Sequence, residues 1–417
     1  MRSMVIVAVM MAMASPGYGA DAVETEGEHR VPERVFDGEP RGPYQTGTFE
    51  ELWVDAQREE TTTSVPGDKR HLMVQVWYPA SFRGDPVRAR YVLHPGLYER
   101  ETWWSLPLVE RMATTSVLRA PVAPGPAWPV VVYNPGGAHP QFVGTFAAEF
   151  LASHGYVVVG IGHTGLNRIA RFPDGTRYEQ DRESPWLTDE EAGKFDDDQA
   201  YSEQINRFSR LMMPVHMQDI RFVLDRLSVL NETKGDRFYR RLDLEHVGAF
   251  GWSLGGALSL QASRDDDRIK AAINMDGTIF SDVGETGTHR PVMVMLAEDT
   301  EAPNLVDASE YIGHLRDRLR FWRFFGRCDH DWYLLSIART DHGDFSDTPL
   351  MQDHGPEALR HLHPRLAHEI INAYTLEFFD RYLRGNPDAP LLSGARSYVE
   401  AKIQSRRPPE AQPAVAK

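Results

Sequence analysis

The chain of 417 residues has little cysteine, no long apolar run in its interior and no block of positive charge. Its one cysteine, Cys328, excludes an intrachain disulfide and a cysteine-rich zinc site. Beyond the N-terminal segment, no apolar stretch approaches the roughly 18 residues of a membrane-spanning helix. The chain has 45 Lys and Arg residues and 60 Asp and Glu residues, so its net charge is −15. Binding to nucleic-acid phosphates requires a basic face, and the sequence has no block of Lys and Arg that would form one. We therefore expect neither a nucleic-acid partner nor stable membrane insertion; the oligomeric state stays open.

The first residues have the pattern of a targeting signal. Arg2 precedes an apolar run over residues 4–14, and small residues with a proline follow over 15–20. This order is typical of a secretory signal peptide, and the run is too short to cross a bilayer. We expect a signal peptide over residues 1–19 and a periplasmic or secreted mature protein.

The rest of the chain has the composition of a folded protein, with 41% apolar and 25% charged residues. Residues 20–69 are rich in Glu, Gly, Pro and Thr and predict an N-terminal arm, whereas 406–417 predict a disordered tail. We expect one domain over 70–405. Its residues 164–244 predict an insertion, the first part of which could form a lid, followed by a crossover helix.

Short apolar runs alternate with helical patterns through this domain. Continuous apolar runs of this length are typical of parallel strands that are buried on both faces. The expected strands occupy residues 72–79, 129–133, 156–161, 247–250, 269–275, 291–296 and 332–338. The alternation predicts an α/β fold, with a mostly parallel central sheet, helices on both faces and the insertion between the strands at 156–161 and 247–250.

One short motif predicts a catalytic residue. Residues 251–255 read Gly-Trp-Ser-Leu-Gly, directly after an expected strand and directly before an expected helix. In this context Gly-x-Ser-x-Gly forms a sharp turn that exposes the serine hydroxyl above the sheet. The pattern predicts Ser253 as a nucleophile, which needs a base because a serine hydroxyl is weak by itself.

Position selects the base among 16 histidines. In this arrangement the acid and the histidine follow the serine, at the carboxyl ends of later strands. His342 lies just past the last expected strand, whereas His330 precedes that strand and lies at the wrong end of the sheet. We expect His342 to be the general base.

Two aspartates qualify as the acid that orients the base. Asp276 ends the expected strand 269–275, and Asp299 follows the strand 291–296. Both lie at carboxyl ends, so generic geometry does not decide between them. Asp276 has apolar residues before it and Gly after it, whereas Asp299 lies among glutamates. A triad acid is buried, which favours Asp276 and keeps Asp299 as the alternative.

The oxyanion that forms during acyl transfer needs two backbone N–H donors. Leu254, directly after the serine, is expected to supply one. The loop after strand 129–133 contains paired glycines, so we expect the second from Gly137. Gly136 is the alternative donor and a candidate for substrate contact. Trp252 and His163, the latter at a strand's carboxyl end, are further candidates for substrate contact.

These residues together resemble the α/β-hydrolase superfamily over about 70–390. Within it, the chain is similar to plasma-type platelet-activating-factor acetylhydrolases and their bacterial relatives, the dienelactone-hydrolase-like carboxylesterases. The resemblance is carried by Trp-Tyr-Pro at 77–79, Asn-Pro-Gly-Gly at 134–137, the glycine-rich turn at 251–256, Asp276 right after its strand, and His342 with Phe345 three residues on. It implies the α/β-hydrolase fold, an acid at the earlier strand (Asp276) and ester hydrolysis.

The chain departs from the family pattern at two places. Trp252 stands where the acetylhydrolases usually carry His, and Asn134-Pro135 stands where the animal enzymes have Ser-His. The turn Gly-Trp-Ser-x-Gly-Gly is also similar to some secreted polyester hydrolases.

The expected function is hydrolysis of small or short-acyl carboxylic esters through an acyl-enzyme, with no cofactor. No metal is expected either, because His361, His363 and His368 lack an acidic partner at ligand spacing. A polyester or cutin-type hydrolase or a lipase is the alternative. A serine peptidase and a non-catalytic binding protein on the same scaffold are weaker ones.

Overall fold

The computed structural model describes residues 42–98, 112–165, 169–179, 209–298, 319–351 and 361–406, apart from residues 62, 64 and 280. The expected signal peptide, the tail beyond residue 406, most of the expected lid and the alternative acid Asp299 lie outside these residues.

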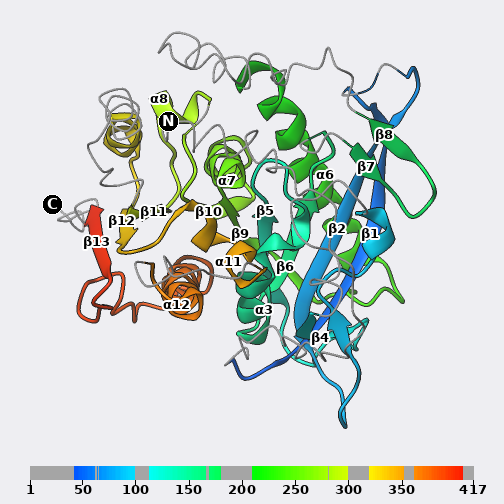
Figure 1. Ribbon diagram of the computed structural model, residues 1–417, viewed down its shortest axis with the longest axis horizontal. Helices are drawn as coiled ribbons and strands as arrows, with labels where there is room; N and C mark the ends of the chain where they lie inside the picture. Colours follow the sequence, from blue (N-terminus) through cyan, green and yellow to red (C-terminus); the bar gives the residue numbers. More distant parts are fainter. Residues whose placement is uncertain are drawn as a thin grey trace, which may run out of the picture.

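The described residues form a central sheet with helices on both faces (Figure 1). The strands are β1 (Gln45–Glu59), β2 (Lys69–Ala80), β3 (Arg88–Arg90), β4 (Ala113–Leu118), β5 (Trp128–Asn134), β6 (Val157–Gly162), β7 (Ile169–Arg171), β8 (Arg177–Glu179), β9 (Leu242–Trp252), β10 (Ile269–Met275), β11 (Val292–Ala297), β12 (Trp332–Ile337) and β13 (Ala401–Arg406). The helices are α3 (Thr145–Ser153), α6 (Met213–Glu232), α7 (Leu254–Asp265), α8 (Val283–Thr286), α11 (Thr348–Met351) and α12 (Pro364–Leu383), with 3-10 turns η1 (Pro95–Leu97), η2 (Gln141–Gly144) and η3 (His342–Phe345).

Eleven of these strands make one sheet, in the order β13-β12-β11-β10-β9-β5-β6-β2-β1-β4-β3. The strands from β6 through β5, β9, β10 and β11 to β12 pair in parallel, whereas β2 and β13 join the two sides of this block in antiparallel orientation. The mostly parallel sheet confirms the predicted fold class. Because all parallel strands end at one edge, their following loops gather there.

The alternation of side chains along each parallel strand divides the core in two. On β5, Val131 and Tyr133 pack in the cluster that contains α3 and α12, whereas Val130 and Val132 pack in the cluster that contains α6 and α7. Figure 1 shows these two helix pairs on opposite faces of the sheet. Burial on both faces explains why these strands are continuous apolar runs in the sequence.

Four of the eleven strands, β1, β3, β4 and β13, lie outside the seven expected strand ranges, although the sequence allowed one strand within the N-terminal arm. β1 pairs with β2 from Gln45 opposite Ala80 to Glu59 opposite Lys69, so the sheet begins well before residue 70, inside the segment expected to be an arm. Its buried residues include Thr46, Thr48 and Glu50 as well as apolar ones, which hides the strand period. β13 is mostly exposed at the sheet edge, so it has no apolar pattern either.

Candidate active site

The carboxyl edge of the sheet holds a concentration of strained backbone. Seven non-glycine residues with positive φ occur in the described part of the chain, and four of them follow the ends of β5, β9, β10 and β12. They are Ala138, Ser253, Asp276 and Arg339. Such conformations are costly for residues with a Cβ and cluster at functional sites.

Ser253 forms the turn between β9 and α7. Its φ of 56° and ψ of −123° reverse the chain within one residue, and its backbone N–H donates to Met275 O at 2.8 Å. A Cβ on Gly251 would lie 2.3 Å from Gly255, and one on Gly255 would lie 1.9 Å from Asn134 O. Both flanking positions therefore require glycine, which explains the spacing of the motif.

His342 contacts Asp276 directly. The two atoms His342 Nδ1 and Asp276 Oδ2 are 2.7 Å apart, and both side chains are buried. The other carboxylate oxygen, Oδ1, accepts from Ala297 N–H at 3.0 Å. Because a carboxylate accepts hydrogen bonds, the proton of a neutral His342 lies on Nδ1 and leaves Nε2 with the lone pair of a base.

The loop that carries His342 is locally ordered by two carboxylates. Asp341 accepts from Gly343 N–H at 2.8 Å, and Asp344 accepts from Asp341 N–H at 2.8 Å, which makes a reciprocal capping box around η3. The structure thus brings together Asp276 and His342, as expected from sequence.

Trp252 lies between the base and the glycine loop. Its Nε1–H donates to His342 O at 2.7 Å, and a Cβ on Gly136 would lie 2.7 Å from its ring. Only 2% of Trp252 is exposed. This position favours a supporting role for Trp252 over the substrate contact expected from sequence.

His139 is a neighbour of the site to which the sequence assigned no role. It lies two residues after Gly137, and its Nδ1 donates to Gly137 O at 2.6 Å. Its ring centroid is 4.6 Å from that of Trp252. Burial lowers the pKa of His139 to about 4, and the nearby His342 adds to this, so His139 is neutral at pH 7 and holds the glycine loop by a neutral hydrogen bond. Its place two residues after the paired glycines is the only signal in the sequence.

The expected oxyanion donors lie at the start of α7 and in the glycine loop. Leu254 is the first residue of α7, where N–H groups lack helical acceptors. Gly137 follows Gly136 in the loop that presses on Trp252.

His163 has protein partners on both ring nitrogens. Nδ1 lies 3.0 Å from Asp219 Oδ2, and Nε2 lies 3.1 Å from Asn134 Oδ1. The side chain is fully buried. These contacts favour a structural position over the substrate contact expected from sequence.

Two groups among the described residues have metal-ligand spacing: His163 with His216 and Asp219, and Asp341 with Asp344 and His361. The first does not fit a cation, because the Asp219 carboxylate already accepts from the guanidinium groups of Arg58 and Arg70. In the second, both carboxylates are used as caps of η3.

Comparison with known sequences finds relatives for most of the chain. The family model described as "Platelet-activating factor acetylhydrolase, isoform II" matches residues 100–384. A probable 1-alkyl-2-acetylglycerophosphocholine esterase of Arthroderma benhamiae is 25% identical over 290 residues, which cover 65% of either chain. The platelet-activating factor acetylhydrolase of Cavia porcellus is 24% identical over 277 residues, which cover 63% of this chain and 59% of the relative. The matches thus span less than two thirds of the length of either relative.

The structure is similar to that of a ferulic acid esterase from Streptomyces cinnamoneus. The TM-score is 0.67 at 27% identity, and the match covers 87% of this chain and 97% of the other. Among the described residues, no helix is long and apolar enough to cross a bilayer.

Proposed function

The chain belongs to the platelet-activating factor acetylhydrolase, isoform II, family, and from this premise we propose that it hydrolyses carboxylic esters through an acyl-enzyme on Ser253. The observation that carries the proposal is the 2.7 Å contact between His342 and Asp276 at the sheet edge that also holds the strained turn of Ser253. This is the arrangement that a serine nucleophile needs.

Acylation begins with Ser253 Oγ, which attacks the ester carbonyl carbon while His342 Nε2 takes its proton. Asp276 keeps the imidazole in the tautomer with the proton on Nδ1 and stabilises the imidazolium that forms. The backbone N–H groups of Leu254 and Gly137 donate to the oxygen as it becomes negative. The bond between the acyl carbon and the alcohol oxygen then breaks as His342 gives its proton to that oxygen. The C=O double bond re-forms, which leaves an acyl-enzyme on Ser253 Oγ.

Deacylation repeats these steps with water. His342 takes a proton from the water, whose oxygen attacks the acyl carbon, and the same two amides hold the second oxyanion. Collapse returns the proton to Ser253 Oγ and releases the carboxylic acid. All of these steps use groups of this chain.

We place the substrate among esters of small acyl groups. Support comes from the family and from two relatives whose names specify an acetylhydrolase and an acetylglycerophosphocholine esterase. The N-terminal pattern of Arg2 and an apolar run supports a periplasmic or secreted location.

A second candidate is hydrolysis of esters of an aromatic acid. It is favoured by the ferulic acid esterase, because the match covers nearly all of that chain. The same triad would act on both kinds of ester, so the two candidate functions differ only in the acyl group that the site accepts.

The test is a series of p-nitrophenyl esters from acetate to palmitate together with methyl ferulate, with Ser253→Ala as the control. Rates that fall with acyl length and vanish in the variant support the short-acyl proposal. A preference for methyl ferulate supports the second candidate, and a maximum at long chains indicates a lipase or polyester hydrolase. A folded protein with no activity on any ester contradicts both candidates.

A further inference from the structure

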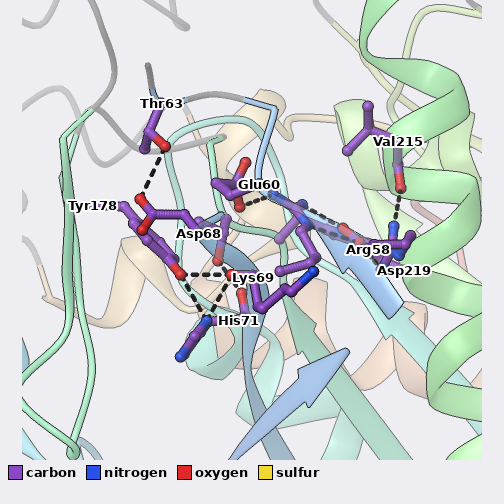
Figure 2. A network of polar contacts seen from close by, with 12 residues as sticks. Arg58, Glu60, Thr63, Asp68, Lys69, His71, Tyr178, Val215 and Asp219 are labelled. Carbon is purple, nitrogen blue, oxygen red and sulfur yellow. Dashed lines mark hydrogen bonds and ion pairs between the residues drawn. The ribbon is translucent and has the colours of Figure 1, made fainter. Parts of the chain in front are cut away.

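A cluster of ionisable side chains is buried where β1 and β2 meet α6 (Figure 2). Arg70 donates to both oxygens of Asp219, at 2.9 and 2.6 Å, and to Glu60 Oε2 at 2.8 Å. Arg58 donates to Asp219 Oδ1 at 2.8 Å. The side chains of Arg70, Glu60 and Asp219 are at most 1% exposed, so the cluster carries a large desolvation cost.

Opposite charges of the cluster lie against one another, and Arg58 also pairs with Asp55 at 2.6 Å. Burial opposes ionisation of Asp219, but the guanidinium of Arg70 and the hydrogen bond from His163 hold its pKa well below the usual range. Asp219 is therefore charged at neutral pH, opposite the two arginines. A buried ion-pair cluster of this kind adds little net stability relative to apolar packing.

The cluster continues to the nucleophile helix through two side chains. His163, just after β6, has Nδ1 at 3.0 Å from Asp219 Oδ2 and Nε2 at 3.1 Å from Asn134 Oδ1. Burial lowers the pKa of His163, so the neutral ring donates through Nδ1 to Asp219 and packs through its other edge against the amide of Asn134. Asn134 Nδ2 donates to Ser259 Oγ at 3.0 Å, and Ser259 Oγ donates to Gly255 O at 2.8 Å. One path of close polar contacts therefore runs from Asp219 on α6 to the first turn of α7.

Asn134 is also the residue from which the glycine loop starts. Its backbone oxygen lies against Gly255, at 1.9 Å from where a Cβ would stand, and its side chain is fully buried. Gly136 and Gly137 follow it at once. A shift of Asn134 relative to α7 would therefore shift one expected oxyanion donor, Gly137, relative to the other, Leu254.

We propose that Asp219, His163 and Asn134 form a positioning unit. The unit keeps the backbone N–H groups of Gly137 and Leu254 in the relative position that the oxyanion requires, an inference that rests on the proposed function. Asp219, held by two arginines, fixes the ring of His163. The ring in turn fixes the amide of Asn134 against Ser259. The unit touches no reacting atom; it acts through the backbone of the loop.

The ring of His216 closes the other side of this unit. Its centroid is 4.9 Å from that of His163, and its Nδ1 lies 3.4 Å from Asp219 Oδ2. The ring of His163 is thus confined between Asp219, Asn134 and His216, which suits a fixed support and leaves no ligand position for a metal.

The experiment compares Asn134→Ala with Glu60→Gln in the full chain. Glu60 contacts Arg70 in the same cluster but lies outside the path to Asn134, so both variants disturb buried polar contacts. We expect Asn134→Ala to lower kcat about 10- to 100-fold with KM within about threefold, because the donors matter chiefly in the transition state. Affinity for a trifluoromethyl ketone, whose adduct carries an oxyanion, falls in parallel. Glu60→Gln lowers the Tm and keeps kcat per folded molecule.

Should Asn134→Ala not fold, His163→Asn replaces it, since an amide can still donate to Asp219 while the contact to Asn134 is lost. A kcat of the folded variant within about twofold of wild type overturns the proposal, as does an equal loss of kcat in Glu60→Gln. If wild type hydrolyses esters and Ser253→Ala does not, the proposed function stands, whatever the kcat values of the Asn134, His163 and Glu60 variants are. A wild type without ester hydrolysis overturns the function and this inference together.

Discussion

Two buried histidines in this molecule each lie against a buried aspartate, and the two pairs differ in what surrounds them. His342 Nδ1 is 2.7 Å from Asp276, and His163 Nδ1 is 3.0 Å from Asp219. The Asp276 pair follows strands whose ends are strained, at Ser253 and at Asp276 itself. The Asp219 pair lies among arginines. A histidine–aspartate contact alone is therefore not a sign of catalysis.

The difference in charge suits the two proposed roles. Asp219 has its negative charge neutralised permanently by Arg58 and Arg70, so the pair is suited to hold a position. Asp276 accepts from a neutral backbone amide, that of Ala297, besides His342. Its charge is then available to stabilise an imidazolium that forms only during the reaction.

Asp276→Asn gives the largest expected contrast. Asparagine can donate to Nδ1 and so stabilises the wrong tautomer of His342, which should lower kcat by about 10⁴-fold with little change in Tm. The measurement is steady-state hydrolysis of a p-nitrophenyl ester together with thermal unfolding.

Asp299→Asn is the matched control, because Asp299 is the alternative acid. It should keep nearly full activity. The opposite outcome, with activity lost in Asp299→Asn and kept in Asp276→Asn, would assign the acid to Asp299.

Asp219→Asn should lower the stability of the fold and also kcat, because Asp219 belongs to the proposed positioning unit. The substitution leaves two arginines without their buried counter-charge, so the free energy of unfolding should fall by about 3–5 kcal/mol. Urea denaturation measures this. Glu51→Gln, which breaks the half-exposed pair of Glu51 with Arg119, is the control and should cost less than about 1 kcal/mol. An equal loss of unfolding free energy in Asp219→Asn and Glu51→Gln would contradict the expectation that the buried ion pair matters more than the exposed one.

Gly255→Ala tests the junction of the two regions, since Gly255 contacts both the nucleophile turn and Asn134. The added Cβ would lie 1.9 Å from Asn134 O, and relief of this clash should lower kcat at least tenfold and cost about 1–3 kcal/mol. Gly326→Ala, where a Cβ meets no atom within 4 Å, is the control for both measurements. Unchanged kcat in Gly255→Ala would mean that the turn tolerates displacement.

The smallest expected effect is a pH dependence from His216. Burial lowers its pKa to about 4, so between pH 6.5 and 4 the unfolded chain binds a proton that the folded chain does not. His216 therefore destabilises the fold progressively as the pH falls through this window, by up to about 1.4 kcal/mol per pH unit. Urea unfolding at several pH values gives the free energy of unfolding of wild type and of His216→Gln. The difference between the two free energies should change with pH by this slope. A constant difference would contradict the low pKa.

The sequence predicts the reactive region better than the supporting one. The turn at 251–255 is a local pattern, and β10 occupies the expected residues 269–275, so the sequence alone places Asp276 at a strand end. The roles of Ser253, Asp276 and His342 stay predictions until tested. The surroundings of His163 could not be predicted, because its neighbours Asp219 and Arg70 are distant in sequence and look there like ordinary charges on a helix and a strand.

The most direct test of the account is to trap the acyl-enzyme. Wild-type protein is mixed with p-nitrophenyl acetate, quenched in acid within the burst phase and digested, and the peptides are examined by mass spectrometry. We predict one acetyl group, located on Ser253, in step with a burst of p-nitrophenol of one equivalent, and neither in Ser253→Ala. Steady hydrolysis with the acetyl group on another residue, or with no burst and full activity in Ser253→Ala, would contradict the account.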